Sequence, residues 1–199
     1  MTISAVPPRL IDANEFWDTY ADREPTYELV AGIPVMTPFE DFENTAAMGW
    51  LTYLLIATFG RRYQYAPHAG LHLPAADGGP DTIRVPDLVV RERPARAPSR
   101  GDVSGVVLVV EVVSPASTAT DWIDKRREYA AAGIEHYLIV DVRGPVPLVW
   151  LLSGPGGAPA TYPDPGGDGG AVTFTIGGTT MTGPVRTSPR PCSDARTAS

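Results

Sequence analysis

Hydrophobic residues recur along the chain at two spacings, one typical of helices and one typical of strands. The clearest helical stretch, residues 44–59, has an apolar residue at every third or fourth position, and Gly60 is a natural stop for it. Its apolar side comprises Met48, Leu51, Leu55 and Phe59, widened by Trp50, Leu54 and Ile56. A second helix is predicted over residues 117–132, after hydroxyl residues that can cap it and before Gly133, and a short one over residues 11–20.

Strand-like segments occupy much of the chain between these helices. Residues 26–30 and 33–37 are separated only by Ala31-Gly32, which predicts a β-hairpin. Further strands are predicted at residues 63–73, 83–91, 106–113, 136–140 and 148–152. Residues 106–113 are mostly β-branched and almost all apolar, which is typical of a central strand covered on both faces.

The composition changes after the last of these strands and divides the chain into three parts. Of the eighteen residues 153–170, eleven are glycine or proline, so this stretch is predicted to be a loop or linker. Residues 171–176 are typical of one edge strand, and the polar residues after them are expected to fray. We therefore predict an N-terminal extension over residues 1–25, one domain over residues 26–152, and a loop, possible edge strand and flexible tail over residues 153–199.

The overall composition excludes several classes of protein. Of the 199 residues, 43% are hydrophobic, which is enough to build a core. The single cysteine, Cys192, excludes a disulfide framework and a Cys-rich zinc site. The first residues lack the pattern of a secretory signal, and no apolar run is long enough to span a bilayer. We therefore expect a cytoplasmic protein with no membrane partner.

The charge balance argues against a broad cationic surface. The net charge is −7, from 23 acidic and 16 basic residues, whereas proteins that hold nucleic acid on an extended face are usually basic. A nucleic-acid role would therefore need a local basic patch or a metal ion held by carboxylates. The predicted loop over residues 91–105 supplies such a patch, and its arginines are Arg91, Arg93, Arg96 and Arg100.

Glu111 is the residue that least fits its surroundings, because it lies inside the apolar run of residues 106–113. Burying a carboxylate is costly unless a charged partner or a metal ion compensates. A second carboxylate, Asp87, follows Pro86 at the start of another apolar segment, and the two would converge if their strands are neighbours. Two carboxylates with water and phosphate oxygens are the ligands that Mg²⁺ prefers. Lys125, fourteen positions after Glu111, could balance a phosphate or orient an attacking water.

Each of these residues also has a purely structural interpretation. Glu111 could be an edge-strand residue or part of a structural salt bridge. Pro86-Asp87 is a common turn dipeptide, and Lys125 could be a solvated residue paired with Asp121, four positions earlier. The order of the three, with Asp87 and Glu111 on successive strands and Lys125 on the following helix, favours the functional interpretation.

Several segments of the chain carry these residues in a recognisable order. They are Tyr-Glu-Leu-Val-Ala-Gly at residues 27–32, Val-Pro-Asp-Leu-Val-Val at 85–90, Val-Val-Glu-Val-Val-Ser-Pro at 109–115, Asp-Trp-Ile-Asp-Lys at 121–125 and Tyr-Ala-Ala-Ala-Gly-Ile at 129–134. This set resembles the putative restriction endonuclease (Uma) family of the PD-(D/E)XK nuclease superfamily, over roughly residues 27–152. The resemblance implies an α/β (mixed α+β) fold with a restriction-endonuclease-like core, in which a central mixed sheet is flanked by helices and accompanied by an N-terminal β-hairpin.

The resemblance also implies a divalent-metal site, phosphodiester hydrolysis and roles for individual residues. Asp87 and Glu111 would bind Mg²⁺ or Mn²⁺, and Lys125 would be the catalytic lysine, moved from the strand to the following helix. The superfamily pattern places this lysine two positions after the glutamate, where this chain has Val113. Glu28 is a fourth catalytic candidate, and its alternative is a hairpin residue exposed to water.

A further departure concerns the start of the first long helix, where relatives usually carry a histidine and this chain has Asn44. Asn44 can cap the helix and is an auxiliary site candidate, but it cannot shuttle a proton. His68 and His72 are expected to be surface residues, since a zinc site would need a third ligand.

We therefore expect a Mg²⁺-dependent endonuclease that acts on DNA, is a homodimer and contacts its substrate through the arginines of the basic loop. One alternative is a binding or scaffold protein that keeps the nuclease fold with weak or no activity. Another is a metal-assisted hydrolase of a small phosphate ester.

Overall fold

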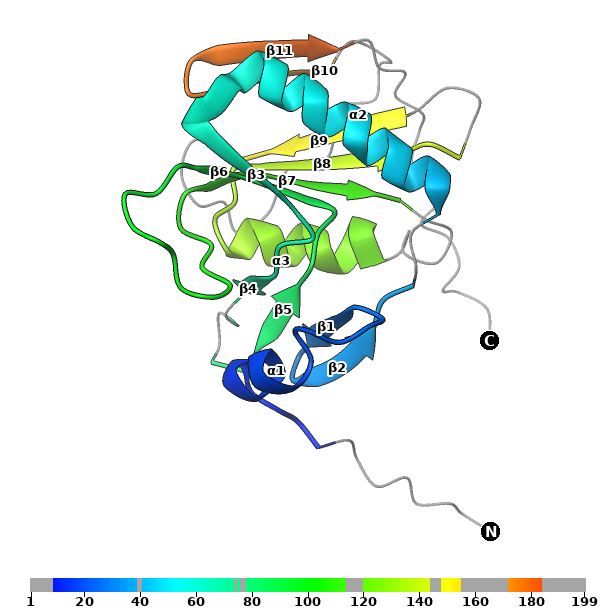
Figure 1. Ribbon diagram of the computed structural model, residues 1–199, viewed down its shortest axis with the longest axis vertical. Coiled ribbons are helices and arrows are strands. Elements are labelled where there is room, and N and C mark those ends of the chain that lie inside the picture. Colours follow the sequence, from blue (N-terminus) through cyan, green and yellow to red (C-terminus); the bar gives the residue numbers. More distant parts are fainter. Residues whose placement is uncertain are drawn as a thin grey trace, which may run out of the picture.

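The computed structural model describes residues 9–38, 41–73, 75, 78–113, 120–143, 148–154 and 172–183 (Figure 1). The helical elements are α1 (Ala13–Thr19), α2 (Phe42–Phe59), the 3₁₀ turn η1 (Gly60–Arg62), the π-helical segment η2 (Thr120–Lys125) and α3 (Arg126–Ala131). The strands are β1 (Tyr27–Val30), β2 (Ile33–Met36), β3 (Tyr63–Pro67), β4 (Leu71–Leu73), β5 (Thr82–Arg84), β6 (Leu88–Glu92), β7 (Val106–Val112), β8 (His136–Asp141), β9 (Leu148–Ser153), β10 (Val172–Ile176) and β11 (Thr179–Gly183). Within the described ranges, no helix is both long enough and apolar enough to cross a bilayer.

A five-stranded sheet forms the centre of the molecule, in the order β3-β6-β7-β8-β9. The pair β7–β8 is parallel and the other pairs are antiparallel, so the sheet is mixed. β7 lies in the middle, and all of its residues except Val107 are buried. This is the arrangement that its almost unbroken apolar sequence predicts.

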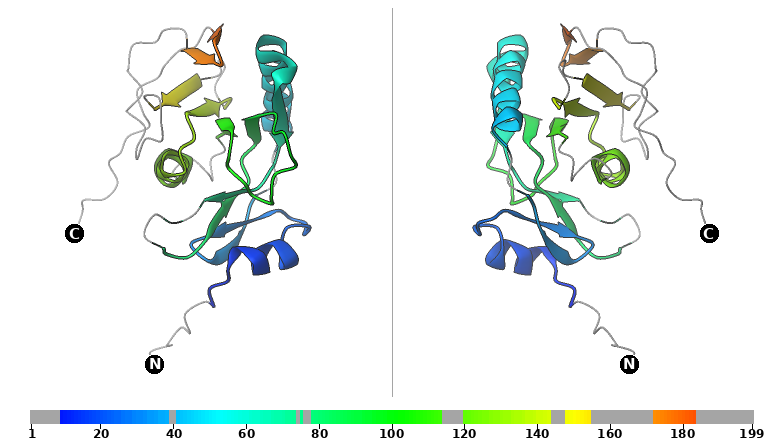
Figure 2. Two further views of the ribbon diagram at one scale, coloured as in Figure 1. Left: turned by 90° about the vertical axis from the view of Figure 1, so that its left-hand side faces the viewer. Right: turned by 90° about the vertical axis from the view of Figure 1, so that its right-hand side faces the viewer.

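Helices cover both faces of this sheet, α2 on one side and α3 on the other (Figure 2). Successive side chains of a strand point to opposite faces, so β7 contributes to two separate clusters. Leu108 packs with Leu55 of α2. Val109 packs with Tyr129 of α3. By the same alternation Glu111 points to the side of α3.

Four short strands form a second sheet, in the order β2-β1-β5-β4. β1 and β2 make the predicted hairpin around Ala31 and Gly32, which both have positive φ. The helix α1 packs on this sheet, where Phe16 is buried with Leu29 and Ile83. The predicted mixed sheet flanked by helices, with its N-terminal hairpin, is therefore confirmed.

Two of the predicted strands are wrong, because each is divided between the two sheets. Residues 63–73 form β3 in one sheet, turn at His68, whose φ is 51°, and form β4 in the other. Residues 83–91 divide at Pro86-Asp87 into β5 and β6, since proline has no N–H with which to continue a ladder. The two turns are neighbours, because the backbone N–H of His68 donates to the carbonyl oxygen of Asp87 at 3.4 Å.

The first long helix differs from the prediction at its start and on its outer side. Asp41 is the capping residue, and its side chain accepts a hydrogen bond from the N–H of Asn44, so Asn44 is not the cap. Trp50 and Ile56 are 64% and 43% exposed. They lie on the side of α2 turned away from the sheet, so the prediction that they widen its buried side is wrong.

The last described residues form a hairpin of β10 and β11, not one edge strand followed by a frayed chain. Ile176 of β10 and Met181 of β11 pack on the cluster beside α2. The predicted second helix is present as η2 followed by α3, and Gly133 with φ 77° follows its end. The predicted caps Ser117 and Thr118, and most of the Gly/Pro-rich stretch, lie outside the described residues.

Candidate active site

A cavity of about 660 Å³ lies where β5 leads into β6 and where β7 ends. Four of its lining residues are the predicted catalytic residues Glu28, Asp87, Glu111 and Lys125. The other described residues that line it are Glu24, Pro25, Thr26, Val30, Val35, Met36, Thr37, Pro38, His68, Arg84, Val85, Val112, Thr120, Asp121 and Asp124. Six of these lining residues are carboxylic acids and two are lysine or arginine, so the cavity is acidic.

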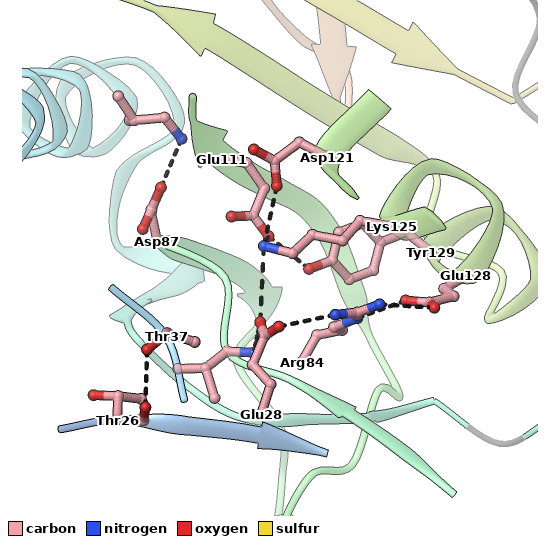
Figure 3. Close-up of polar contacts among 12 residues, drawn as sticks. Thr26, Glu28, Thr37, Arg84, Asp87, Glu111, Asp121, Lys125, Glu128 and Tyr129 are labelled. Atoms are coloured by element: carbon pink, nitrogen blue, oxygen red, sulfur yellow. Dashed lines mark hydrogen bonds and ion pairs between the residues drawn. The ribbon is translucent and has the colours of Figure 1, made fainter. Parts of the chain in front are cut away.

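Glu111 lies at the end of β7 and is only 4% exposed. One of its oxygens, Oε1, accepts a hydrogen bond from the hydroxyl of Tyr129 at 2.7 Å and lies 2.9 Å from Nζ of Lys125 (Figure 3). Burial raises the pKa of Glu111 well above its ordinary value, and the nearby carboxylates act in the same direction against the ammonium of Lys125. A carboxylate at this position therefore needs positive charge beside it.

Lys125 supplies that charge from the last position of η2. Its Nζ lies 2.9 Å from Glu111, 3.2 Å from Asp121 and 3.7 Å from Glu28 (Figure 3). Burial opposes the charged ammonium, but these carboxylates outweigh it and raise the pKa of Lys125 above its ordinary value. The solvated structural interpretation of Lys125 does not fit, because its side chain is only 9% exposed.

Glu28 is buried too, at 6% exposure, and is not the water-exposed hairpin residue of the alternative interpretation. Its Oε2 accepts a hydrogen bond from Nη1 of Arg84 at 2.9 Å, and its Oε1 accepts one from the N–H of Val85 at 3.0 Å. Burial acts to raise the pKa of Glu28, but the positive charges of Lys125 and Arg84 outweigh this effect and lower it. Arg84 is held in turn by two hydrogen bonds to Glu128, of 2.7 and 2.9 Å.

Asp87 lies at the corner where the chain passes from the second sheet into β6. The antiparallel register of β6 and β7 pairs Leu88 with Val110, which brings Asp87 to the end of β7 that carries Glu111. Its Oδ2 accepts a hydrogen bond from the N–H of Val112 at 2.6 Å (Figure 3). The two predicted metal ligands therefore line one cavity from adjacent strands.

Asp121 belongs to this cluster, although the sequence indicated it only as a helical ion-pair partner of Lys125. It is 1% exposed and lines the cavity with the other carboxylates. The spacing of four residues between Asp121 and Lys125 was the available signal. Whether that pair pointed to solvent or to Glu111 depended on how η2 packs on the sheet.

The arginines of the predicted basic loop do not belong to this cavity. Arg91, Arg93, Arg96 and Arg100 are absent from its described lining. Antiparallel pairing places the loop between β6 and β7 at the far end of both strands from Asp87 and Glu111. Arg91 donates instead to the carbonyl oxygen of Ser104 at 2.6 Å, and Arg100 donates to that of Trp17 at 3.4 Å. The loop therefore lies away from the cavity, and its contact with a substrate stays a prediction.

The auxiliary candidate Asn44 and the two histidines lie in different surroundings. Asn44 is buried, at 3% exposure, in the first turn of α2, and it is not among the described residues that line the cavity. His72 pairs with Asp81 at 2.8 Å, whereas His68 is exposed and lines the cavity. The two histidines therefore have different neighbours.

The donor set suits a hard cation held by few protein ligands. In the described part of the chain, no group of three or more histidine, cysteine, aspartate or glutamate residues is arranged to hold a metal ion. Asp87 and Glu111 together offer the one or two carboxylates with which Mg²⁺ is usually bound, the rest of its shell being water and phosphate oxygen. One oxygen of each is already fixed by a hydrogen bond, at 2.6 and 2.7 Å, which orients the other.

Comparisons with known proteins confirm the predicted restriction-endonuclease-like fold. A family model described as "Putative restriction endonuclease" (Uma2) matches residues 13–167. The solved structure of a putative nuclease belonging to DUF820 from Anabaena variabilis ATCC 29413 superposes with a TM-score of 0.55 and 16% sequence identity, over 73% of this chain and 86% of that chain. A comparison with curated proteins gives no match.

Proposed function

Since the chain belongs to the putative restriction endonuclease (Uma2) family, we propose that it is a divalent-metal-dependent phosphodiester hydrolase that cleaves DNA. Family and fold indicate a nuclease, and the metal ion, the DNA substrate and the roles of individual residues are the proposed part. The observation that supports this most strongly is the position of Lys125. Its ammonium reaches Glu111 at 2.9 Å beside Asp87, in a cavity large enough for a phosphodiester group.

Asp87 and Glu111 would hold Mg²⁺ or Mn²⁺ at the end of β7. When bound there, such an ion neutralises phosphate charge and lowers the pKa of a bound water. A divalent cation is also what the cavity needs in order to accept a polyanion, because its carboxylates outnumber its lysine and arginine residues. The acidity of the whole chain is therefore compatible with a nucleic-acid substrate.

Lys125 would stabilise the negative charge that develops on the phosphate, and Glu28 would keep it in place. Both oxygens of Glu28 are engaged by Arg84 and Val85, so Glu28 is a positioning residue in this proposal and not a metal ligand. Asp121 would also keep Lys125 in place, because its carboxylate lies 3.2 Å from the ammonium. The predicted catalytic role of Glu28 is thus refined to holding a catalytic lysine.

Cleavage of supercoiled plasmid in MgCl₂ or MnCl₂ tests the proposal. Lys125→Gln removes the charge next to the phosphate and is expected to lower the cleavage rate by about 100-fold, as for the loss of one electrostatic stabiliser. Glu111→Gln is expected to abolish cleavage. Glu92→Gln is the matched control, because Glu92 is an exposed carboxylate paired only with Arg62 in the described structure and should leave the rate unchanged.

Binding of Mn²⁺, measured by calorimetry, separates the enzyme from a nuclease-fold scaffold protein. The wild type is expected to bind the ion, and Asp87→Asn to bind it more weakly by at least about tenfold. Equal cleavage by the wild type and by a Glu111→Gln, Lys125→Gln double variant would show that the activity belongs to a contaminant. No Mn²⁺ binding by the wild type would refute the enzyme and favour the scaffold protein.

A further inference from the structure

The side of α2 that points away from the sheet is unusually apolar for a helix surface. Four of its large residues are exposed, namely Phe42 at 82%, Trp50 at 64%, Tyr53 at 59% and Ile56 at 43%. Ala46, Gly49 and Ala57 are exposed on the same helix, and we call these seven residues the outer face of α2. A surface helix normally carries polar residues on this side, and a contiguous exposed apolar patch marks an interaction site.

Gly49 is a second, independent observation on this face. A Cβ atom built at Gly49 would meet no atom within 4 Å, so nothing inside the described protein requires a glycine there. Glycine in the interior of a helix is destabilising relative to alanine. A glycine at an open, central position of α2 is explained if another backbone approaches closely at this point.

The outer face of α2 is complementary to itself. If two copies of α2 cross antiparallel, with the two-fold axis between positions 51 and 52, each Trp50 lies opposite the partner's Tyr53. Each Ala46 then lies opposite the partner's Ala57. The rings of Trp50 and Tyr53 stack within one copy, with centroids 5.3 Å apart, and form a preassembled aromatic surface.

Charge supports the same pairing. Glu43 is the only charged residue between positions 42 and 60, so two chains that each carry a net charge of −7 can meet on this face with little repulsion. The antiparallel arrangement brings Glu43 to the end of the partner's helix, which is followed by the partner's Arg61. Opposite charges therefore meet at both ends of the contact.

The area is sufficient for a second copy. From their exposed fractions, the four large residues would bury about 500 Å² per copy, which gives about 1,000 Å² for a symmetric pair. This is about the smallest area of a specific protein interface, before any neighbouring residue is counted. We propose that the outer face of α2 is the interface of a two-fold symmetric homodimer of this chain, centred on Trp50 and Tyr53.

Sedimentation velocity over about 1 to about 100 µM protein tests this interface, with an expected dissociation constant in the micromolar range. Gly49→Leu is the most informative variant, because the helix has room for the side chain in one copy but not against a second helix. It is expected to weaken dimerisation at least about tenfold while the thermal unfolding midpoint of the monomer stays equal or rises. Trp50→Lys is expected to weaken it by about as much. Leu10→Lys, an exposed apolar residue outside α2, is the control and should leave the dimer intact.

A charge exchange tests the orientation of the two helices. Glu43→Arg and Arg61→Glu should each weaken the dimer several-fold, and the double variant should regain most of the wild-type affinity. A wild type that remains monomeric at about 100 µM would overturn the proposal, and so would a Gly49→Leu variant that dimerises as well as the wild type. Loss of affinity in both charge variants without recovery in the double variant would overturn the antiparallel arrangement. None of these readouts depends on nuclease activity.

Discussion

At the scale of single residues, the site depends on groups that hold other groups in position. Glu111 faces Lys125, and its Oε1 also accepts the hydroxyl of Tyr129. Lys125 in turn is held by Asp121 and by Glu28. Because burial raises the pKa of Glu111, each hydrogen bond donated to its carboxylate favours the ionised form that could bind a cation.

Tyr129→Phe removes the hydroxyl that donates to Glu111 and leaves the ring in the core. We expect Mn²⁺ affinity and the rate of plasmid cleavage to fall by about 10- to 100-fold, the usual effect of losing a group that orients a metal ligand. The free energy of unfolding should change by only about 1 kcal/mol. Tyr65→Phe is the control, since that hydroxyl donates to the carbonyl oxygen of Gly60, away from the cavity. Equal losses in both variants would contradict this role of Tyr129.

At the scale of the elements, the β1–β2 hairpin brings Glu28 to the site. Both residues of its turn have positive φ, 47° at Ala31 and 80° at Gly32. Only the second is a glycine, so Ala31 occupies the left-handed region with a side chain, which is unfavourable for an L-residue. Gly32 is required in addition by space, because a Cβ there would lie 3.1 Å from the Cβ atoms of Leu10 and Pro80.

Substitutions at these two neighbouring positions should therefore have opposite effects. Ala31→Gly is expected to raise the free energy of unfolding by about 0.5 to 1 kcal/mol, because it relieves the left-handed conformation. Gly32→Ala is expected to lower it by more than about 1 kcal/mol, since it adds both strain and a close contact. Urea denaturation of the two variants measures both values. A loss of stability in Ala31→Gly would contradict the interpretation of this turn.

At the scale of the whole molecule, His136 connects the central sheet to the last hairpin. Its Nδ1 lies 2.8 Å from the hydroxyl of Ser153 on β9, and its Nε2 lies 3.3 Å from the carbonyl oxygen of Thr175 on β10. Burial lowers the pKa of His136 below its ordinary value of 6.5, against the opposing effects of Glu135 and of the Thr175 carbonyl. The neutral ring is therefore the form that the fold favours.

Stability should consequently fall as the pH falls below about 6.5. In that range the unfolded chain binds a proton at His136 more readily than the native protein does, so acid favours unfolding. His136→Gln removes this contribution. Below about pH 6.5, the difference in the free energy of unfolding between wild type and variant should therefore change by up to about 1.4 kcal/mol per pH unit. Urea denaturation between about pH 7.5 and about pH 5.5 measures it. Parallel curves for the two proteins would contradict the role of His136.

The sequence indicated the elements well wherever one local pattern decided them. The first long helix, the hairpin and the central position of residues 106–113 follow from periodicity and turn residues. The division of residues 63–73 and 83–91 between two sheets was missed. Alternation of side chains is the same on both sides of a bend, so it gives no sign that the chain leaves one sheet for another.

The sequence predicted the part of the site that local patterns reveal. A glutamate in an apolar strand is visible in the sequence, and its order relative to Asp87 and Lys125 suggested a common site. The structure places these three residues and Glu28 around one cavity. The arginines of the predicted basic loop were expected to contact the substrate, and antiparallel pairing carries that loop to the end of the strands opposite the cavity.

The sequence by itself determined which segments are helical or extended, which strand is fully covered, and which carboxylate is out of place there. These properties depend on residues within a few positions of one another. Only the tertiary structure decided that Asp121, Tyr129 and Arg84 support the site, and that Trp50 faces outward. Such contacts join segments far apart in the chain, and they are set by strand register and by the way helices pack on the sheet, which no local pattern encodes.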